Sequence, residues 1–588
     1  MEAPAPLDKN RFQDSAVPTP SSLMKRCRPQ ILAVVVFSGF ANILQLTTSL
    51  YMMQVFDRVL TGRSFDTLIY LTIIALVALG VLAVLEAVRA RIMERVGAWI
   101  EKRAARPSFE RAMEAGLRGS GYQVEALRDL GVVRSFLASP TMLAIFDLPW
   151  VPVYLLLTVL LHPLIGLVAL ISLGAMITLA LVNERMTSPL FRAANSASMV
   201  AQRRASGIVR HAELIDSMGM APNLVRVWNA ASKEGESDMR RALDLSALFV
   251  AVTKFLRFVF QIAILGVGAY LTLTQRLSPG AAVAGSIVMS RALAPVEQVF
   301  GAWRNIVQAR QAWRRLEDFL SRKGLARSNR SLPRPTGRLS VEQVRFSFPG
   351  QTQPSIRAIS FDLEPGEVLA VIGPSAAGKS TLIRLLTGTL EPNSGAVRLD
   401  GADVFQWQRS DFGRYVGYLP QEVSLFEGTI FENIARMGET LTEDVYEAAK
   451  LAGCHEMILR LPKGYDTRIG DGGQHLSGGQ KQMIGLARAF FGRPVFVILD
   501  EPNSNLDGDA ELALMRAIRR LSEGGTTVVV VSHGPRLVQV CDTVLVLSEG
   551  TISMLGPREE VLARLQQGKA QPKPEEAQMA QEPMQIDS

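Results

Sequence analysis

Hydrophobic residues in the first half of the chain are gathered into six long runs. Each run is close to the roughly 20 apolar residues that a helix needs to cross a bilayer. The third and fourth runs are separated only by His162 and Pro163, which predicts a tight hairpin of two spans. The chain is therefore predicted to begin with a six-span α-helical membrane domain. The predicted spans are residues 31–56, 67–88, 142–161, 164–182, 249–273 and 280–302.

Basic residues are distributed unevenly between the two sides of these spans. The long segments that follow the second and fourth runs are rich in arginine. The opposite side has little beyond Arg58, Arg63 and Arg276, and its loops are too short to hold a folded domain. Because Lys and Arg favour cytoplasmic loops, both long segments and both termini are predicted to face the cytosol. The basic residues of the two segments are Arg89, Arg91, Arg95, Lys102, Arg103, Arg106, Arg111 and Arg118, and then Arg185, Arg192, Arg203, Arg204, Arg210, Arg226, Arg240 and Arg241.

The two long polar segments keep a helical pattern. They are predicted to extend the membrane helices into the cytosol. Each contains one break at which the chain can turn, at residues 119–122 and 217–222. Turns in these places are suited to press on a cytosolic domain, and ordinary loop tips are the alternative.

The pattern changes after the last apolar run. A charged helix is predicted over residues 305–323, followed by a linker rich in Arg, Ser and Pro. Short β-type runs then alternate with helices, which is typical of an α/β domain with a mainly parallel sheet. The two ends of the chain have the composition of disordered segments. The predicted parts are a disordered tail at 1–28, a membrane domain at 29–323, a linker at 324–337, an α/β domain at 338–565 and a disordered tail at 566–588.

Composition agrees with this division. The 588 residues are too many for one core, and 48% are hydrophobic while 20% are charged. The net charge of +8 comes from Lys and Arg beside apolar runs, so no nucleic-acid partner is predicted. Cys27, Cys454 and Cys541 form no C-x-x-C pair, so neither a disulfide framework nor a zinc site is predicted. The polar first thirty residues do not resemble a cleavable signal peptide.

The second half contains a loop of the type that binds phosphate groups. A strand-like run at 367–372 precedes it and a helical run at 381–386 follows it. Its glycines let backbone N–H groups surround the phosphates of ATP at the start of a helix. Lys379 is expected to reach the β- and γ-phosphates and Ser380 to bind Mg²⁺. The loop consists of Gly373, Pro374, Ser375, Ala376, Ala377, Gly378, Lys379, Ser380 and Thr381.

Two carboxylates follow the apolar strand at 495–499. Asp500, at the end of the strand, is suited to bind the metal. Glu501 is suited to act on the attacking water, as a general base or a polarising group. Two solvated acids in a strand-end turn are the alternative, which the phosphate loop makes unfavourable.

A second anion cradle is formed by Leu476, Ser477, Gly478, Gly479 and Gln480, directly before an apolar helix. One nucleotide does not need two cradles from the same chain. Two copies facing head to tail would use both, each copy offering Ser477 to the Lys379 site of the other. The sequence therefore predicts a homodimer with two active sites.

The second cradle resembles the signature of the ABC ATPases. This resemblance implies that Phe348 stacks on adenine in place of the commoner Tyr, and that Gln421 contacts Mg²⁺ and senses the membrane domain. It also implies that 504–507 is the D-loop and that His533 contacts the γ-phosphate. Residues 467–473 occupy the place of a loop that touches the membrane domain, although their composition differs. The predicted catalytic residues are Glu501 and His533; the nucleotide-binding residues are Phe348, 373–381, Gln421 and 477–480; and the metal ligands are Ser380, Gln421 and Asp500.

Four further strings resemble the type I secretion ABC transporters, which export alkaline proteases, lipases and related proteins. The resemblance extends over residues 29–565 and implies the six-span ABC exporter fold fused to a P-loop ATPase. It also implies a Gram-negative inner-membrane protein that works with a periplasmic membrane-fusion adaptor and an outer-membrane channel. The expected cargo is an unfolded protein with a C-terminal signal. The four strings lie at 126–130, 145–154, 290–298 and 501–507.

Some members of that group carry an N-terminal peptidase domain. Only about thirty residues precede the first span here, and the first histidine is His162, so no Cys/His leader peptidase is expected. A homodimeric drug or lipid exporter would share the same ATPase. A channel or receptor regulated by ATP is a further alternative, which intact Glu501 and His533 disfavour.

Three cations lie within or beside the predicted spans. Arg291 lies near the middle of the sixth span, and Lys254 and Arg257 lie in the first half of the fifth. Charged residues in a membrane are costly and usually face an aqueous cavity. We hypothesise that these cations line a cavity that attracts acidic chains. A position of Lys254 and Arg257 below the membrane is the alternative.

Overall fold

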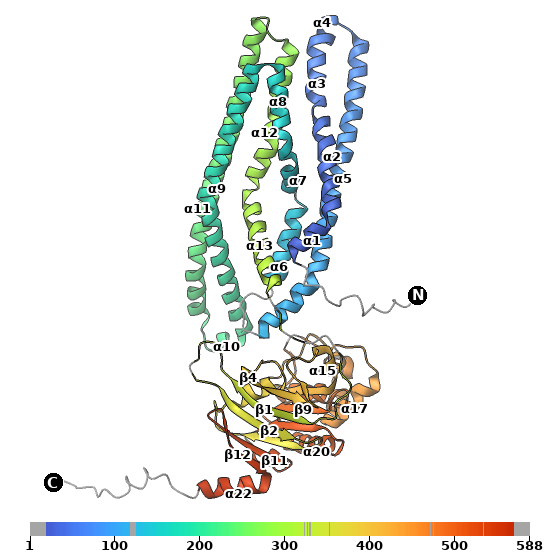
Figure 1. Cartoon of the computed structure of the whole chain (residues 1–588), viewed down its shortest axis with the longest axis vertical. Coiled ribbons are helices and arrows are strands. Elements are labelled where there is room, and N and C mark those ends of the chain that lie inside the picture. The colour runs from blue at the N-terminus through green and yellow to red at the C-terminus, as the bar shows by residue number, and fades with distance from the viewer. Residues whose placement is uncertain are drawn as a thin grey trace, which may run out of the picture. The chain divides into compact units, whose positions relative to one another are not determined.

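The computed structural model of the chain describes residues 19–117, 125–322, 324–325, 327, 331–351, 353–470, 472–473, 475–532 and 534–569. The chain divides into two units, Met1–Gly324 and Leu325–Ser588. The first unit is built from helices, whereas the second combines helices and strands (Figure 1). The division falls at the start of the predicted linker.

Within the described residues, six helical segments of the first unit are long and apolar enough to cross a membrane. They coincide with the six predicted spans, so this part of the predicted fold is confirmed. His162 and Pro163 separate the third segment from the fourth, as expected. The six segments are Arg28–Gly62, Phe65–Leu117, Pro140–Leu161, Pro163–Val209, Ala221–Leu273 and Pro279–Gly301.

Three of the helices are far longer than a bilayer is thick. They are α5 (Phe65–Leu117), α9 (Pro163–Arg210) and α11 (Ala221–Leu273). At about 1.5 Å per residue each is roughly 70–80 Å long, whereas the hydrocarbon core measures about 30 Å. The long polar segments are therefore continuations of membrane helices, as predicted.

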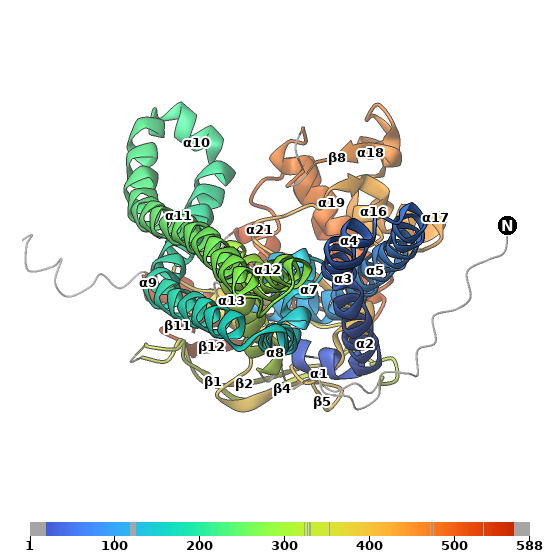
Figure 2. The same ribbon diagram turned by 90° about the horizontal axis from the view of Figure 1, so that it is seen from above.

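The short helix α10 (Ala212–Ser217) joins α9 to α11, which lie side by side (Figures 1 and 2). The backbone turns between α10 and α11, within the predicted break at 217–222. The other predicted turn, at 119–122, falls outside the described residues.

Two of the spans are interrupted. The third contains a 3₁₀ turn at Leu148–Trp150, where Pro149 and Pro152 remove backbone donors from the helical hydrogen-bond pattern. The first contains a π-helical turn at Val55–Val59 near its far end. The interrupted spans consist of α2 (Arg28–Gln45), α3 (Thr47–Gln54) and α4 (Leu60–Gly62), and of α7 (Pro140–Asp147) and α8 (Val151–Leu161).

A buried polar network connects four helices of this unit. Arg89 of α5 forms an ion pair of 2.8 Å with Asp147 of α7, and it also donates to Ser38 of α2. Asn42 of α2 donates to the same carboxylate and accepts from the hydroxyl of Tyr154 in α8. Arg89 is only 3% exposed, so it is not one of the loop charges with which it was grouped from sequence.

The predicted N-terminal tail is partly folded. Residues 20–26, which were predicted to be disordered, form helix α1 (Pro20–Arg26). Leu23 is buried against the first unit, and the backbone N–H of Ser21 donates to Glu317 of α13 (Trp303–Ser321) at 2.9 Å. The composition of this segment predicted disorder because few of its residues are hydrophobic. The burial of Leu23 and the hydrogen bond to Glu317 nevertheless hold the helix against the membrane unit. At the other end, α22 (Arg558–Lys569) continues past the predicted boundary at 565.

The second unit has a six-stranded sheet in the order β12-β11-β3-β10-β9-β6. Only β12 is antiparallel to its neighbour, so the predicted mainly parallel sheet is confirmed. All residues of β9 and β10 are buried, as expected for strands with both faces covered. The strands are β3 (Val368–Ile372), β6 (Val416–Leu419), β9 (Phe496–Asp500), β10 (Thr527–Val531), β11 (Thr543–Ser548) and β12 (Thr551–Pro557).

A four-stranded antiparallel sheet in the order β2-β1-β4-β5 packs with the core of this unit. The strands of the second sheet are β1 (Leu339–Phe346), β2 (Ile356–Leu363), β4 (Ser394–Leu399) and β5 (Ala402–Asp403), and β7 (Gly428–Thr429) pairs with β8 (Arg468–Ile469). The helices named below are α14 (Lys379–Leu386), α15 (Arg409–Tyr415), α17 (Thr442–Ala452), α19 (Gly478–Phe490), α20 (Gly508–Glu523) and α21 (Pro535–Val538).

Part of the predicted linker is fixed to the second unit. The backbone N–H of Leu332 and the hydroxyl of Ser331 donate to Asp411 of α15, at 3.0 and 3.2 Å. The hydroxyl of Thr336 donates to Asp400 at 2.7 Å. Residues 331–337 are therefore an edge of the α/β unit, and the connection between the units is shorter than the predicted 324–337.

Candidate nucleotide site

The phosphate loop has the predicted strand–loop–helix setting. It follows β3 and leads into α14, whose N-cap is Gly378. Gly373 has φ 156°, and a Cβ there would lie 2.2 Å from the carbonyl oxygen of Leu547. Gly378 has φ 104°. The glycines are therefore required both by the backbone conformation and by the close packing of β11.

Lys379 curves back over this loop. Its Nζ donates to the carbonyl oxygens of Gly373 and Pro374, at 2.8 and 2.9 Å. The side chain is buried, and burial lowers the pKa of the ammonium group while the charges of Glu501 and Asp500 oppose this change. A cation held inside a loop of backbone donors is suited to bind phosphate groups.

The sheet brings the other predicted residues to the same edge. Val531 of β10 pairs with Val371 of β3 on one side and with Asp500 of β9 on the other. Leu419 of β6 pairs with Leu499 of β9. Because the carboxyl ends of parallel strands share one edge, the phosphate loop, the two carboxylates and the loop with Gln421 all leave the sheet there.

Asp500 and Glu501 lie in different environments. Asp500 is buried, and burial together with the charge of Glu501 raises the pKa of its carboxyl to about 6, although Lys379 and Arg384 act in the opposite direction. Glu501 has φ 47°, and its backbone N–H donates to the carbonyl oxygen of Val531. Arg384 was not predicted as a site residue, since its place in α14 carries no motif.

Gln421 contacts the predicted catalytic acid. Its Nε2 donates to Oε2 of Glu501 at 3.0 Å. Its side chain therefore lies beside the carboxylate of Glu501. The contact with Mg²⁺ that the resemblance implied stays a prediction. The hydrogen bond to Glu501 joins the end of β6 to the end of β9 through side chains that are 80 positions apart in the chain.

The residues predicted to bind Mg²⁺ offer a hydroxyl, an amide and one carboxylate. No group of three or more His, Cys, Asp or Glu side chains suited to a metal is found among the described residues. Mg²⁺ commonly uses one or two carboxylates and takes its other ligands from water and phosphate. The buried Asp500 also lacks full charge compensation, which a divalent cation would supply. Ser380, Gln421 and Asp500 therefore fit Mg²⁺ bound with a nucleotide.

The second anion cradle lies at the start of α19. Ser477 and Gln480 form a capping box, in which Gln480 N–H donates to Ser477 Oγ and Ser477 N–H donates to Gln480 Oε1. A Cβ on Gly479 would lie 2.9 Å from the carbonyl oxygen of Asn505 in the predicted D-loop. A cavity of about 600 Å³ lies against the cradle and the D-loop. Gly479 is therefore needed for the close packing of α19 against the D-loop.

Of the two remaining predicted site residues, only Phe348 lies within the described part of the chain. Phe348 is half-buried beyond the end of β1, where its ring packs edge-on against Phe346 at a centroid distance of 4.9 Å. The same core cluster includes Ala377 of the phosphate loop, so Phe348 packs on the core that supports this loop. His533 falls outside the described residues, and its assignment stays a prediction.

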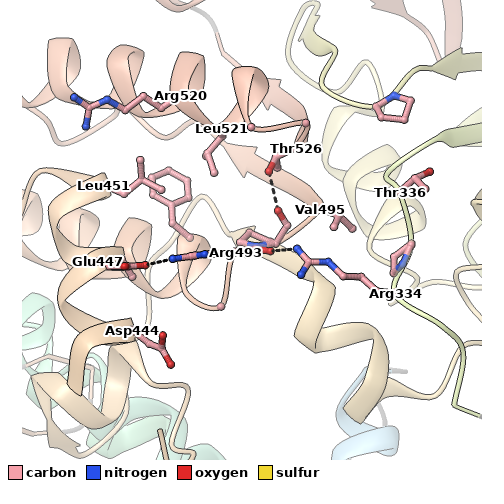
Figure 3. Close-up of a pocket in the computed structure, with 18 residues that line it drawn as sticks. Arg334, Thr336, Asp444, Glu447, Leu451, Arg493, Val495, Arg520, Leu521 and Thr526 are labelled. Carbon is pink, nitrogen blue, oxygen red and sulfur yellow. Dashed lines mark hydrogen bonds and ion pairs between the residues drawn. The ribbon is translucent and has the colours of Figure 1, made fainter. Parts of the chain in front are cut away.

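A wide cavity of about 910 Å³ lies elsewhere on this unit (Figure 3). It is lined by residues that precede β9 and β10, such as Val495 and Thr526, and by Arg334. Arg493 is paired with Glu447 of α17 at 2.8 Å, and its carbonyl oxygen accepts from Arg334. None of the predicted nucleotide-binding residues lines this cavity, which lies at the amino ends of the strands.

The three cations of the predicted spans have unequal surroundings. Arg257 of α11 forms an ion pair of 3.1 Å with Glu297 of α12 (Pro279–Gly301) and stacks on Phe258. Its charge is therefore paired with a carboxylate of the neighbouring helix, and its place in a cavity that attracts acidic chains stays a hypothesis. Lys254 is exposed and Arg291 is half-buried.

Comparison with known proteins decides the family. The ABC transporter transmembrane region matches residues 31–294, and the ABC transporter family matches residues 356–504. The type I secretion system ATP-binding protein PrsD of Rhizobium meliloti is 40% identical over 551 residues, which cover 93% of this chain and 94% of PrsD. The chain belongs to the type I secretion ABC transporters. This transporter is therefore an ATPase whose activity is coupled to transport.

More distant relatives agree. The cyclolysin secretion/processing ATP-binding protein CyaB of Bordetella pertussis is 28% identical over 90% of this chain and 75% of its own length. The leukotoxin translocation ATP-binding protein LktB of Mannheimia haemolytica is 27% identical over 91% and 76%. A bacterial Atm1-family ABC exporter with ATP bound has the same fold, with a TM-score of 0.80, 20% identity and coverage of 93% of this chain and 99% of that one.

Proposed function

We propose that this transporter is the homodimeric motor of a type I secretion system. In this proposal it moves an unfolded protein with a C-terminal signal across the Gram-negative inner membrane, toward a periplasmic adaptor and an outer-membrane channel. The observation that carries the proposal is the 40% identity with PrsD, which extends through the membrane unit as well as the ATPase. The names of CyaB and LktB, which refer to cyclolysin and leukotoxin, support a protein cargo.

The residues of the site suggest how ATP is bound. Lys379 Nζ donates to the carbonyl oxygens of Gly373 and Pro374. A bound ATP would replace these carbonyl oxygens with its β- and γ-phosphates, and the N–H groups of the loop and of α14 would surround them. Mg²⁺, held by Ser380, Gln421 and Asp500, would neutralise charge that develops on the phosphate oxygens.

Glu501 is suited to activate water because of its place at the strand end. Its main chain is fixed to Val531, and its carboxylate accepts a hydrogen bond from Gln421. In the proposed reaction, Glu501 accepts or polarises the proton of the water that attacks the γ-phosphorus, and His533 contacts the γ-phosphate. Gln421, which would help to hold Mg²⁺ in this proposal, also donates to Glu501, so it connects the residues that would hold the metal to the residue that acts on water.

Two copies are proposed to complete the site. The cradle at Ser477 and the loop at Lys379 are both built as anion sites within one chain. A head-to-tail dimer gives each ATP one loop and one opposing cradle. Because all proposed catalytic positions are occupied by suitable residues, a second copy of the same chain is a sufficient partner.

The proposed orientation places the ATPase unit and both termini in the cytoplasm. It rests on the arginines of α9 and α11 beyond the apolar parts of these helices, set against the short opposite turns. ATP is available on that side. Export away from the cytoplasm then follows from the position of the motor.

ATP turnover by the purified transporter in lipid nanodiscs tests the cargo class. A peptide with the last 50 or so residues of a protein encoded beside the transporter would be added, with a scrambled peptide as control. We expect at least a roughly twofold change in turnover with the native peptide alone, since a ligand shifts an equilibrium only when it binds the two states differently. Stimulation by small amphiphiles, with no response to the native peptide, would favour a drug or lipid exporter and contradict the proposal.

A further inference from the structure

The side chain of Asn503 connects two segments near the predicted catalytic residues. Its Nδ2 donates to Oε1 of Glu511 in α20 at 3.1 Å. Its Oδ1 accepts a long hydrogen bond of 3.5 Å from the hydroxyl of Ser532, directly after β10. An amide can make both contacts because it has a donor and an acceptor. Asn503 lies between Glu501 and the D-loop. Its side chain therefore connects this stretch of the chain to α20 and to Ser532, the residue before His533.

Gly534 packs against the same amide. A Cβ on Gly534 would lie 2.9 Å from Nδ2 of Asn503, and its backbone N–H donates to the hydroxyl of Ser532 at 3.0 Å. The residues on both sides of position 533 are thus in contact with Asn503 or with its partner. The φ of Gly534 is negative, so a larger residue here would displace the amide of Asn503 rather than strain the backbone.

Glu511 anchors the amide. Its other oxygen, Oε2, pairs with Arg536 of α21 at 3.2 Å. The Glu511 side chain is only 15% exposed, and it lies in the first turn of α20, where the helix dipole favours a carboxylate. Each oxygen of this carboxylate therefore has a separate partner. Asn503, Glu511 and Arg536 form one chain of contacts, which we call the 503–536 relay.

Helix α19, which begins at the predicted ABC signature, contacts Pro502, the residue next to Asn503. Gln482 of α19 is 1% exposed, and its Nε2 donates to the carbonyl oxygen of Pro502 at 3.0 Å. Gly479 of the same helix touches the carbonyl oxygen of Asn505. The segment from Pro502 to Asn505 is therefore held by α19 on one side and by the 503–536 relay on the other.

We propose that Asn503 and Glu511 are positioning residues for ATP hydrolysis, which set the spacing between Glu501 and the residues Ser532 and Gly534 at the end of β10. The proposal rests on the catalytic role proposed above for Glu501. Displacement of a reacting group by about 1 Å can reduce a rate about 100-fold, so small shifts in this segment are sufficient to lower turnover. Asn503 and Glu511 are not themselves expected to touch ATP.

Four variants of the full-length transporter in nanodiscs test the positioning role. Asn503→Ala removes both contacts, and Asn503→Asp keeps the volume but places a carboxylate beside Glu511. We expect kcat to fall about tenfold or more in both, while KM for ATP changes less than about twofold, because the interaction acts on the transition state. Glu511→Ala should behave in the same way. Glu511→Gln keeps an acceptor for Asn503, and it should retain at least about half of the wild-type kcat.

Two controls separate the possible outcomes. Glu342→Ala removes a more exposed ion pair with Arg398, at 3.3 Å, from the other sheet, and it should leave kcat and KM unchanged. Glu501→Gln should be inactive. Wild-type turnover in Asn503→Ala with an inactive Glu501→Gln would overturn the positioning role alone, whereas wild-type turnover in Glu501→Gln would overturn the catalytic assignment. Equal losses in Glu511→Gln and Glu511→Ala would likewise contradict the positioning role, even if Asn503→Ala proves unstable.

Discussion

At the scale of single residues, the hydrogen bond from Gln421 to Glu501 is central. It places the residue that the family resemblance links to Mg²⁺ in contact with the proposed acid that acts on water. Lys379, by contrast, donates to the carbonyl oxygens of its own loop. Both side chains are thus positioned by hydrogen bonds within the site.

Replacing Glu501 by Gln tests the proposed acid. Gln has nearly the same volume but cannot accept a proton, so we expect turnover to fall by about 10²–10⁴-fold. Binding of ATP should persist, since the phosphate loop and Lys379 are unchanged. Phosphate release and equilibrium binding of a fluorescent ATP analogue measure the two effects. Turnover at the wild-type rate would show that Glu501 is not the general base.

Replacing Arg291 by Ala tests the hypothesis that cations of the spans line a cavity. Of the three cations, Arg257 pairs with Glu297, and Arg291 is less exposed than Lys254. A cation in a water-filled path attracts acidic segments, so secretion of an acidic cargo should fall at least severalfold. Secretion into the medium is compared with that of Arg276→Ala, at the short turn outside the spans. Unchanged secretion in Arg291→Ala would remove Arg291 from the proposed path.

At the scale of elements, hydrogen bonds attach the end of the predicted linker to the α/β unit, although its composition alone had placed it outside that unit. Asp411 of α15 accepts hydrogen bonds from Trp407, Leu332 and Ser331. Burial on its own would raise the pKa of this carboxyl, but the hydrogen bonds outweigh burial and the pKa is lowered. The ionised form therefore stabilises the fold and fixes the end of the linker.

The lowered pKa of Asp411 predicts a pH-dependent stability. A depressed folded-state pKa gives stability that is present above the unfolded value of about 3.9 and is lost as pH falls through the folded value. Asp411→Ala leaves buried donors without an acceptor and should cost about 1–3 kcal/mol at pH 7. Thermal unfolding of the purified transporter at pH 7 and below pH 4 measures this. The difference from wild type should shrink at the lower pH, and a constant difference would contradict the role of the charge.

The Arg89–Asp147 ion pair predicts coupling between α5 and α7. Removal of one partner leaves a buried charge uncompensated, so Arg89→Met should destabilise the membrane unit by about 3–5 kcal/mol. The double variant Arg89→Met with Asp147→Leu should recover part of this loss. Thermal unfolding in detergent of both single variants and the double variant gives the coupling. Strictly additive losses would show that the pair does not act as a unit.

At the scale of the whole molecule, local patterns were enough to predict the six spans, their long helical continuations and the strand–loop–helix at the phosphate loop. Each depends on residues that are near one another in sequence. The docking of α1, the burial of Arg89 and the pairing of Arg257 with Glu297 depend on packing between distant segments. No local pattern reports such packing, and the same is true of the contact between Asn503 and Ser532.

The motifs of the site were predictable because phosphate binding demands glycines and a lysine at fixed spacing. The contacts that support these motifs could not be predicted from the sequence. Gln482, Arg384 and Glu511 have ordinary helical positions in the sequence, and only the fold brings them to the site. The strings at 126–130 and 501–507 gave a partial signal, because Asp129 pairs with Arg315 and Asn503 with Glu511.

The central claim is that two copies of this chain complete each ATP site. Ser375→Cys in one tagged copy and Ser477→Cys in a differently tagged copy, both with Glu501→Gln, test it by disulfide formation. The native Cys27, Cys454 and Cys541 are buried and free, so background bridging should be low. We predict that ATP promotes a bridged dimer that carries both tags. A copy that carries both cysteines serves as a control. The account would be contradicted if this copy formed the bridge internally and no bridged dimer formed at any ATP concentration.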